Sequence, residues 1–413
     1  MTFWFHRNPL KHTIAAPFDL KFAATNAEAV KICSELRKTR EKLIEGLSGL
    51  DSDETTIETL FTEYLSLLRG FYENADPTGG DTSKLRGVMK FKWSHSMLGS
   101  TLMSQIDVIY EVISICQEYA FWLMKRTSLL VMKASELSED QLKKIHKDLR
   151  RASGVILEMK SNFIPLLENR DPAGSDLDTK VLDAYICQCM AEAQEVTIHR
   201  AIALKHSSSL IAALTNETSQ KFLEAAIQIK ALEISKFGKW MHYLQIKCCC
   251  YNALTYSFYG DNLLAMEKCG EGVKCCQEAA KKLEVLAPLC KEYSKMKGQG
   301  AAPKLEQTAF FQHVRATVNR LKDKCERENT LIFHHKLPLE VPKLELKATH
   351  GLVAPDEFKM PAISSYWTPF ACTAFEQMLM TMMKNLSLDE SPQGKEKSPK
   401  KDKKDKKEKK SPK

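Results

Sequence analysis

Hydrophobic positions recur with a helical period over most of the chain. Between residues 26 and 327, apolar side chains return at intervals of three and four residues, the spacing of one helix face. Ser138 and the acidic residues after it favour a helix start at that point. Residues 1–25 read as a short extended or hairpin segment and 88–93 as a strand. We predict helices at 26–48, 53–72, 103–131, 138–160, 177–205, 208–234, 236–259, 261–296 and 303–327.

The pattern changes after residue 335. Prolines recur up to Pro369 and the periodicity weakens, which predicts an extended strap on the surface of the helical body. From about residue 384 the chain consists mainly of Lys, Ser, Pro, Asp and Glu. Such a segment cannot bury enough apolar surface to become ordered. We therefore expect one domain over 1–375 and a disordered Lys-rich tail over 376–413.

Residues 251–279 resemble a tetratricopeptide hairpin. Tyr259 and Gly260 would close the first helix, and Leu264 and Cys269 would open the second. The predicted fold is mostly α: a curved helical solenoid with a tetratricopeptide-like core, a short N-terminal β segment and the C-terminal strap.

The stretch "AEAQEVTIHRAIALKHSSSLIAAL" (191–214) predicts two helices joined at "KHSSS". Glu192, Glu195, His199 and His206 are spaced to form one narrow polar strip. The other sides of this hairpin are small or apolar, whereas a surface helix needs only one apolar stripe. Something must cover the remainder, either neighbouring helices of the core or a partner molecule. For Ala193, Val196 and Ala201 we prefer core packing.

Charge is concentrated at one end of the chain. The net charge is +8, and residues 395–413 contain eleven Lys and four acidic residues, so the rest carries about +1. The folded part is therefore not basic, and we expect no nucleic-acid partner. Thirteen cysteines without a secreted-type framework, and no segment with the layout of a signal peptide or a membrane span, predict a cytoplasmic protein with reduced thiols.

No enzymatic motif is found. HExxH, GxGxxG and P-loop patterns are absent, and "IHKDLRRAS" (145–153) lacks the companion motifs of a kinase. Cys187 and Cys189 would point about 200° apart on a helix, and Cys248 to Cys250 would fan around one, which suits core filling better than zinc. "FHH" (333–335) lacks a third ligand. We expect no catalytic residue, metal, cofactor or small-molecule substrate.

The predicted helix at 138–160 carries a stripe of mostly basic residues. Glu139, Lys143, Lys147 and Arg150 follow one another at steps of four, four and three, so they share one helix face. A solvated surface explains this pattern. The alternative is a basic border beside a groove, which would favour a partner with acidic flanks.

Several segments resemble the BRO-domain family. They are "CQCMAEAQEVTIHRAI" with "LIAAL", the start "WFHRNPLK", the segment "LELKATHGLV" and the late "WTP". The resemblance covers about residues 1–370. It implies a curved, mostly helical body that binds the amphipathic C-terminal helix of ESCRT-III subunits, the charged multivesicular body proteins.

Carried over position by position, the family's apolar docking patch falls on Thr197, Leu210 and Leu214. Its basic positions fall on Lys143 and Lys147, with Arg150 matching a lysine of one member. Thr197 stands where another member has phenylalanine, which predicts a shallower pocket. Because Leu210 and Leu214 are one turn apart, we expect an open apolar ridge that a partner helix covers.

The tail predicts a second contact. Some family members end in a prenylated cysteine box, whereas this sequence ends "KSPK" after a last cysteine at 372, so we expect no such anchor. Attraction to an anionic membrane surface is the functional interpretation, and a solubilising or nuclear-import-like tail is the alternative. The lysines concerned are Lys400, Lys401, Lys403, Lys404, Lys406, Lys407, Lys409 and Lys410.

Together these features predict a non-enzymatic adaptor that works with ESCRT-III in membrane remodelling or endosomal sorting. It would be cytoplasmic, with peripheral association at endosomal or nuclear-envelope membranes. The alternatives are a cytoskeletal or signalling scaffold that uses the same surface, and a thiol-dependent enzyme. The enzyme would require a cysteine of depressed pKa.

Overall fold

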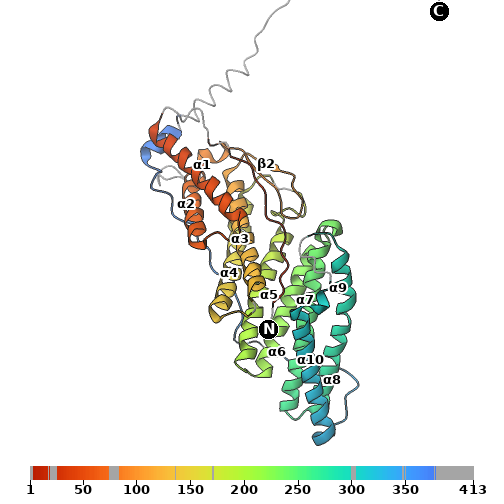
Figure 1. The fold of residues 1–413 in the computed structure, drawn as a ribbon. Coiled ribbons are helices and arrows are strands. Elements are labelled where there is room, and N and C mark those ends of the chain that lie inside the picture. The colour runs from red at the N-terminus through yellow and green to blue at the C-terminus, as the bar shows by residue number, and fades with distance from the viewer. Residues whose placement is uncertain are drawn as a thin grey trace, which may run out of the picture.

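The computed structural model describes residues 3–16, 18, 26–73, 83–134, 136–169, 172–298, 304–346, 348, 350–375 and 377. Helices dominate this part of the chain and pack as an elongated, curved array of antiparallel neighbours (Figure 1). The mostly α, solenoid-like architecture is therefore confirmed. Apart from residue 377, the predicted tail, with all eight of its named lysines, lies outside the described residues. The helices are α1 (Ala27–Ser48), α2 (Glu54–Tyr72), α3 (Val108–Lys133), α4 (Glu139–Glu158), α5 (Thr179–Ala203), α6 (Ser208–Ile229), α7 (Ile234–Ala265), α8 (Cys269–Glu284), α9 (Leu286–Lys295) and α10 (Ala309–Glu328).

Local sequence signals define several helix starts. The Asp53 side chain accepts the Thr56 N–H at the start of α2. At the start of α4, Ser138 and Gln141 form a reciprocal capping box, and the predicted helix start at Ser138 is confirmed. After α4 the chain continues through a π-helical turn, Met159–Phe163, and a 3-10 turn, Ile164–Leu166.

The predicted helix start at residue 103 is wrong. Met103–Gln105 form strand β2, which pairs antiparallel with β1 (Phe91–Trp93). α3 begins only at Val108, because the Asp107 side chain caps it by accepting the Ile109 N–H at 2.9 Å. Thr13 of the N-terminal segment forms a single bridge to Trp93, so the extended start borders this small sheet.

The helix boundaries after residue 259 also differ from the prediction. Gly260 does not end a helix: α7 continues to Ala265, and α8 and α9 are separated at Val285, just before Pro288. Gly260 instead allows close packing against α8, since a Cβ there would lie 2.7 Å from the Gly272 carbonyl oxygen. The prediction that Gly260 closes a helix is therefore wrong, and the residue is a packing site instead.

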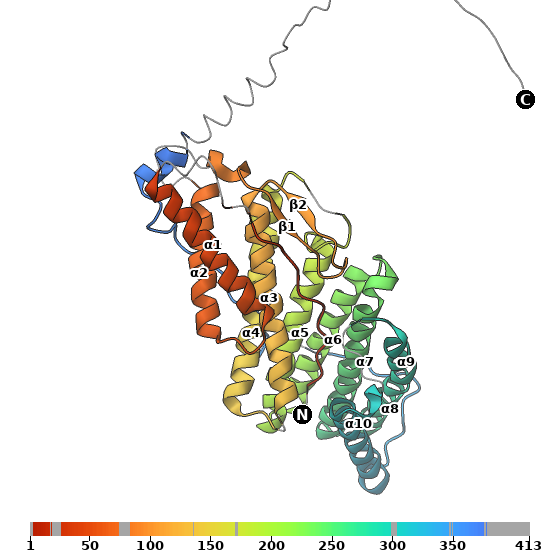
Figure 2. The same cartoon turned by 45° about the horizontal axis from the view of Figure 1, so that its top comes forward.

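The N-terminal segment, residues 3–16, runs along the array between helices that lie far apart in sequence (Figure 2). Arg7 forms a buried ion pair with Glu192 of α5 at 2.8 Å. The hydroxyl of Tyr243 in α7 donates to the same carboxylate at 2.6 Å. Glu118 of α3 accepts the backbone N–H of Lys11 at 2.8 Å. The segment therefore supplies polar partners to helices that would otherwise bury unpaired charge.

The expected polar strip on α5 is wrong. Glu192 and Glu195 are both fully buried, and Glu195 pairs with buried Lys247 of α7 at 2.7 Å. His199 is half-buried against Phe3, and only His206 is exposed. Because the N-terminal segment and α7 cover this side, acidic spacing on the helix does not mark solvent. Ala193, Val196 and Ala201 are buried, as predicted.

The C-terminal strap, defined here as residues 334–368, crosses the array without regular structure in its described part. Its far end is anchored by Trp367, whose indole N–H donates to the Leu67 carbonyl at 2.8 Å. In its middle, the Asp356 N–H donates to the Arg150 carbonyl at 3.1 Å. A Cβ on Gly154 would lie 1.7 Å from the Asp356 carbonyl oxygen, so α4 and the strap are in direct backbone contact.

Candidate functional site

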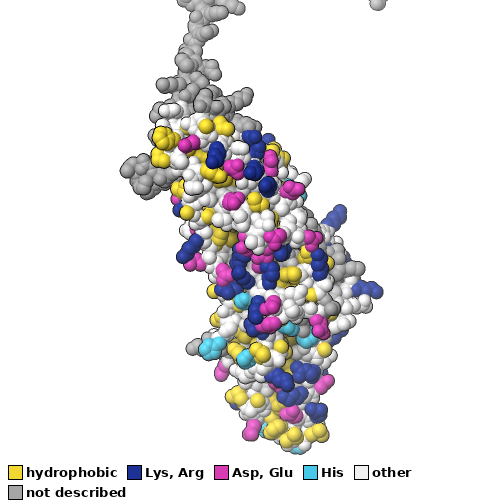
Figure 3. Space-filling view, turned by 60° about the vertical axis from the view of Figure 1, so that its left-hand side comes forward, with side chains coloured by type: hydrophobic (Ala, Val, Ile, Leu, Met, Phe, Trp, Pro, Cys, Tyr) yellow, Lys and Arg dark blue, Asp and Glu magenta, His cyan; other side chains and the backbone are white. Residues whose placement is uncertain are grey.

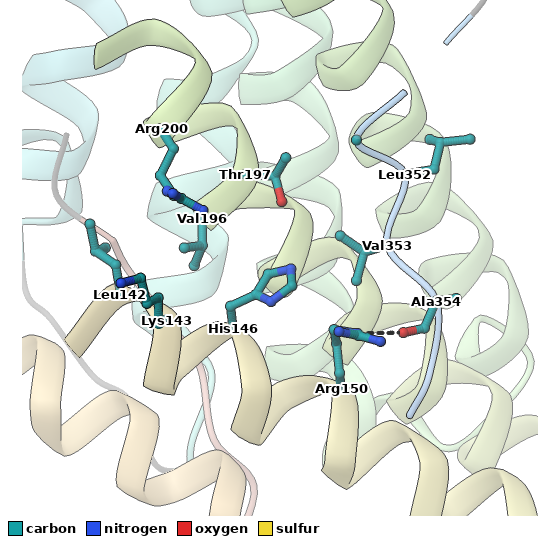
Figure 4. A pocket seen from close by; sticks show the side chains of 11 residues that line it. Leu142, Lys143, His146, Arg150, Val196, Thr197, Arg200, Leu352, Val353 and Ala354 are labelled. Atoms are coloured by element: carbon teal, nitrogen blue, oxygen red, sulfur yellow. Dashed lines mark hydrogen bonds between the residues drawn. The ribbon is translucent and has the colours of Figure 1, made fainter. Parts of the chain in front are cut away.

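A pocket of about 410 Å³ opens where α4, α5 and the strap meet. α4 contributes Lys143, His146 and Arg150 at steps of three and four, which places them on one face. α5 contributes Thr197 and Arg200 from the next helix along the array. The strap closes the third side with residues 351–354 (Figure 4). Three segments that are distant in sequence therefore build one concave site.

Arg150 is directed toward the strap and not into open solvent (Figure 4). Its Nε donates to the Ala354 carbonyl at 2.8 Å, and its guanidinium pairs with Asp356 at 2.5 Å. Both partners belong to the strap, so Arg150 holds the pocket wall. This role differs from that of a free basic border residue.

Exposed lysines of α4 lie at the edge of the pocket, which is called the rim. Lys143 is exposed and pairs with Asp140 at 3.5 Å, a distance at which a surface pair contributes little. Glu139, one turn before Lys143 on α4, pairs with Arg200 of α5 at 2.8 Å. Lys147 is exposed one turn further along α4, outside the pocket lining.

His146 lies at the centre of the pocket, with its ring facing α5 (Figure 4). Burial lowers the pKa of His146, and the neighbouring Arg150 lowers it further. The ring is therefore neutral near pH 7 and can offer one donor and one acceptor.

The predicted open ridge of Leu210 and Leu214 is wrong. Leu214 is only 1% exposed, and Leu210 is half-buried on the outer part of α6. The strap provides the cover: a Cβ on Gly351 would lie 3.4 Å from both Leu214 Cδ2 and Thr197 Cγ2. Gly351 has a φ of +75°, a conformation that glycine adopts without strain. The hairpin's apolar side is therefore covered by the chain itself.

The structure thus brings Thr197, Lys143 and Arg150 together around one pocket and leaves Lys147, Leu210 and Leu214 outside its lining. Sequence reasoning missed His146 and Arg200. His146 lies three residues after Lys143 and four before Arg150, so the stripe's own spacing could have indicated it. The strap residues carry no comparable local signal.

The charges around this site are mixed, since Lys143 pairs with Asp140 and Arg200 pairs with Glu139. Figure 3 shows a face on which Lys and Arg alternate with Asp and Glu along the middle, with hydrophobic side chains at the lower end. Such a face lacks the continuous basic stripe typical of nucleic-acid binding. Among the described residues, no group of three or more metal-ligating side chains is found, and no helix is long and apolar enough to cross a membrane.

The cysteines behave as core residues. Cys189, Cys250 and Cys275 are buried, and burial raises the pKa of each thiol. Cys187 is half-buried, and its pKa rises to about 11 for the same reason. A reactive thiolate needs the opposite environment, so these four side chains do not support the thiol-enzyme alternative.

The helical array, the N-terminal segment and the strap define the class of protein. The chain belongs to the BRO1-like domain family, whose model matches residues 6–377. It is 41% identical over 376 residues to the BRO1 domain-containing protein BROX of Mus musculus, with 91% of each chain covered. The BROX homolog of Caenorhabditis elegans is 36% identical over 386 residues, covering 91% of this chain and 90% of the relative.

A solved structure agrees on the fold. The ALIX BRO1 domain in a complex with CHMP4C superposes with a TM-score of 0.66 at 21% identity, covering 89% of this chain and 98% of that one. The expectation of a BRO-domain fold is therefore confirmed.

Proposed function

We propose that this protein is a non-enzymatic adaptor that binds the C-terminal helix of an ESCRT-III subunit. The pocket between α4, α5 and the strap carries the proposal, because it is concave, open and bordered by exposed lysines. The family supports it, since the structurally similar ALIX domain was solved with CHMP4C.

The pocket accepts one side of an amphipathic helix. An apolar side chain of the partner would enter beside Thr197, while Lys143 and Lys147 attract acidic residues on its flank. Leu210 would extend the apolar rim on α6. Leu214 and Arg150 would act indirectly, by supporting the strap at Gly351 and at Ala354.

The expected affinity is modest. Each Leu-type side chain that becomes fully covered contributes about 1.5–3 kcal/mol, and ordering the partner's tail offsets part of this gain. A micromolar dissociation constant follows, which corresponds to about 8 kcal/mol. Polymerised ESCRT-III would strengthen binding through avidity.

Titration of a CHMP4C-type C-terminal peptide tests this proposal. Leu210→Asp and the double variant Lys143→Glu/Lys147→Glu should each weaken binding about ten-fold or more. Lys268→Glu, which changes an exposed lysine at the α7–α8 turn, is the matched control. Leu214→Asp is unsuitable, because it would place a charge in the core. Unchanged affinity in both rim variants, with native circular dichroism, would reject the assignment.

For the Lys-rich tail we propose electrostatic attraction to anionic membranes. Each basic residue near such a surface contributes about 1 kcal/mol, reduced here by the interleaved acids. Vesicle binding should rise with anionic lipid content and fall with salt. Equal binding by a chain that ends at residue 394 would contradict the proposal.

A further inference from the structure

A second cavity, of about 260 Å³, lies where four chain segments meet. These are the N-terminal segment at residues 6–9, the loop between β1 and β2, the first turns of α7, and the loop that follows α9. The titratable side chains lining it are His6, Arg7, Lys236, Lys239 and Lys297. All five are basic types, and no carboxylate is part of the described lining.

Two of the five do not contribute usable charge. Arg7 is neutralised by its buried pair with Glu192. Burial lowers the pKa of His6 to about 3, so that ring is neutral at physiological pH. Three lysine ammonium groups remain as the positive charge of the cavity.

Lys239 is unusual among them. It is 4% exposed, yet its ammonium donates to the Gly298 carbonyl at 2.8 Å and faces the Tyr293 ring at 5.2 Å. No ion pair with a carboxylate is found for it among the described residues. A buried ammonium usually requires a counter-ion, because a carbonyl and a ring offset only part of the cost of desolvation.

The other two lysines are accessible. Lys236 pairs with Glu233 at 2.7 Å, and both side chains are largely exposed, so the pair is weak and can be replaced. Lys297, in the loop after α9, is exposed. Lys236 lies in the first turn of α7, which runs for 32 residues and has no side-chain cap at its positive end.

We propose that this cavity binds a phosphate group. Three ammonium ions suit a dianion, and lysines act on phosphate as point charges. The planar fork of Arg7, which could bind a carboxylate or a phosphate, is already occupied by Glu192, so the lysines must supply the binding charge. Trp240 and Met97 form an apolar wall that can face the group carrying the phosphate. That group is either a free phosphorylated small molecule or a phosphoinositide headgroup.

Occupation would have a structural effect. The ligand would connect the N-terminal segment to the start of α7 and to the loop after α9. It would do so at a site separate from the pocket proposed for the ESCRT-III helix, so the two proposals can fail independently.

The test is a calorimetric titration of the full chain with inorganic phosphate and with inositol 1,4,5-trisphosphate. We expect saturable binding that weakens at least about ten-fold in Lys239→Met and in Lys236→Ala/Lys297→Ala. The second variant changes only exposed side chains, so it retains the fold even if the first does not. Lys268→Ala/Lys336→Ala, which removes two exposed lysines elsewhere, should bind as the unmodified chain does.

Vesicles of phosphatidylcholine, with and without a phosphoinositide, separate the two sources. Binding to phosphoinositide vesicles that weakens in Lys236→Ala/Lys297→Ala identifies a headgroup, since the tail is present in both proteins. Variant-sensitive binding of the free ligands alone identifies a soluble phosphate compound. Absence of saturable binding, or equal binding in a natively folded Lys236→Ala/Lys297→Ala protein, overturns the proposal.

Discussion

The N-terminal segment and the C-terminal strap both cross the helical array without regular structure, yet they are held differently. The N-terminal segment is fixed by buried charge, as in the Arg7–Glu192 pair. Beside the candidate pocket, the strap is held without buried charge. The uncharged side chain of Gln194 hydrogen-bonds to Gly351 and Val353, and Arg150 makes half-exposed contacts with Ala354 and Asp356.

This difference separates a structural element from an adjustable one. A buried ion pair cannot be opened without leaving a charge unpaired in the core, which is strongly destabilising. Half-exposed hydrogen bonds can be replaced by water or by a partner at small cost. We therefore expect the N-terminal segment to stay in place and the strap at residues 354–356 to yield when a ligand enters the pocket.

The largest effect should come from Arg7→Met. Leaving Glu192 without its ion-pair partner should lower the free energy of unfolding by about 3–5 kcal/mol. Chemical denaturation with urea measures the change. Arg320→Met, on the exposed side of α10, is the control and should stay within about 0.5 kcal/mol of the unmodified chain. Similar losses of unfolding free energy in Arg7→Met and Arg320→Met would contradict the view that buried charge fixes the N-terminal segment.

The next effect depends on pH. Burial raises the pKa of Glu118 to about 8, against the opposing influence of the Lys11 N–H and charge. The folded state therefore binds a proton between about pH 4.5 and 8 that the unfolded state releases, so this group's contribution to stability falls as the pH rises. Glu118→Gln should remove this dependence, which amounts to about 3–4 kcal/mol between pH 5 and pH 8.

Urea denaturation of Glu118→Gln and the unmodified chain at several pH values provides the measurement. The two stability curves should converge near pH 5 and separate toward pH 8, with the glutamine variant higher. Parallel curves would show that Glu118 is ionised in the folded protein and accepts the Lys11 N–H as a carboxylate.

A smaller effect is expected where the strap touches α4. In Gly154→Ala the added methyl group would meet the Asp356 carbonyl, so the strap must move. Overpacking of this kind costs about 1–3 kcal/mol, and the low end applies if the strap yields. Amide exchange should accelerate at residues 350–358 and remain slow in α5. Gly87→Ala, whose new Cβ has its nearest neighbour at 3.9 Å, is the control.

The smallest effect on stability should come from Arg150→Met. The substitution is the same as at Arg7, but the lost pair with Asp356 is partly exposed and contributes about 0–1 kcal/mol. The same denaturation experiment measures it. A loss as large as that of Arg7→Met would mean that the strap is as firmly fixed as the N-terminal segment.

Local features of this fold could be predicted, because they depend on neighbours in sequence. The Ser138 cap, the start of α2 after Asp53 and the proline-rich strap each follow from a few adjacent residues. The burial of Glu192 and Glu195 on α5 could not be predicted, because their ion-pair partners, Arg7 and Lys247, are far away in the chain.

The candidate site also combines features that local sequence predicts with features that depend on distant segments. The face shared by Lys143 and Arg150 follows from helical spacing alone, and the resemblance added Thr197. The burial of Leu214 could not be foreseen, because the residue that covers it, Gly351, belongs to a segment without periodicity. Burial by a segment that is distant in sequence does not change the hydrophobic pattern around the buried residue.

The position of the N-terminal segment also constrains how the chain can mature during synthesis. Arg7 leaves the ribosome 185 residues before Glu192, and Trp4 packs against Phe311 of α10, which is made later still. The N-terminal segment must therefore remain in solvent until most of the polypeptide has emerged. Contacts of such separation form slowly, so a nascent chain interrupted before α10 would expose this segment to chaperones and proteases.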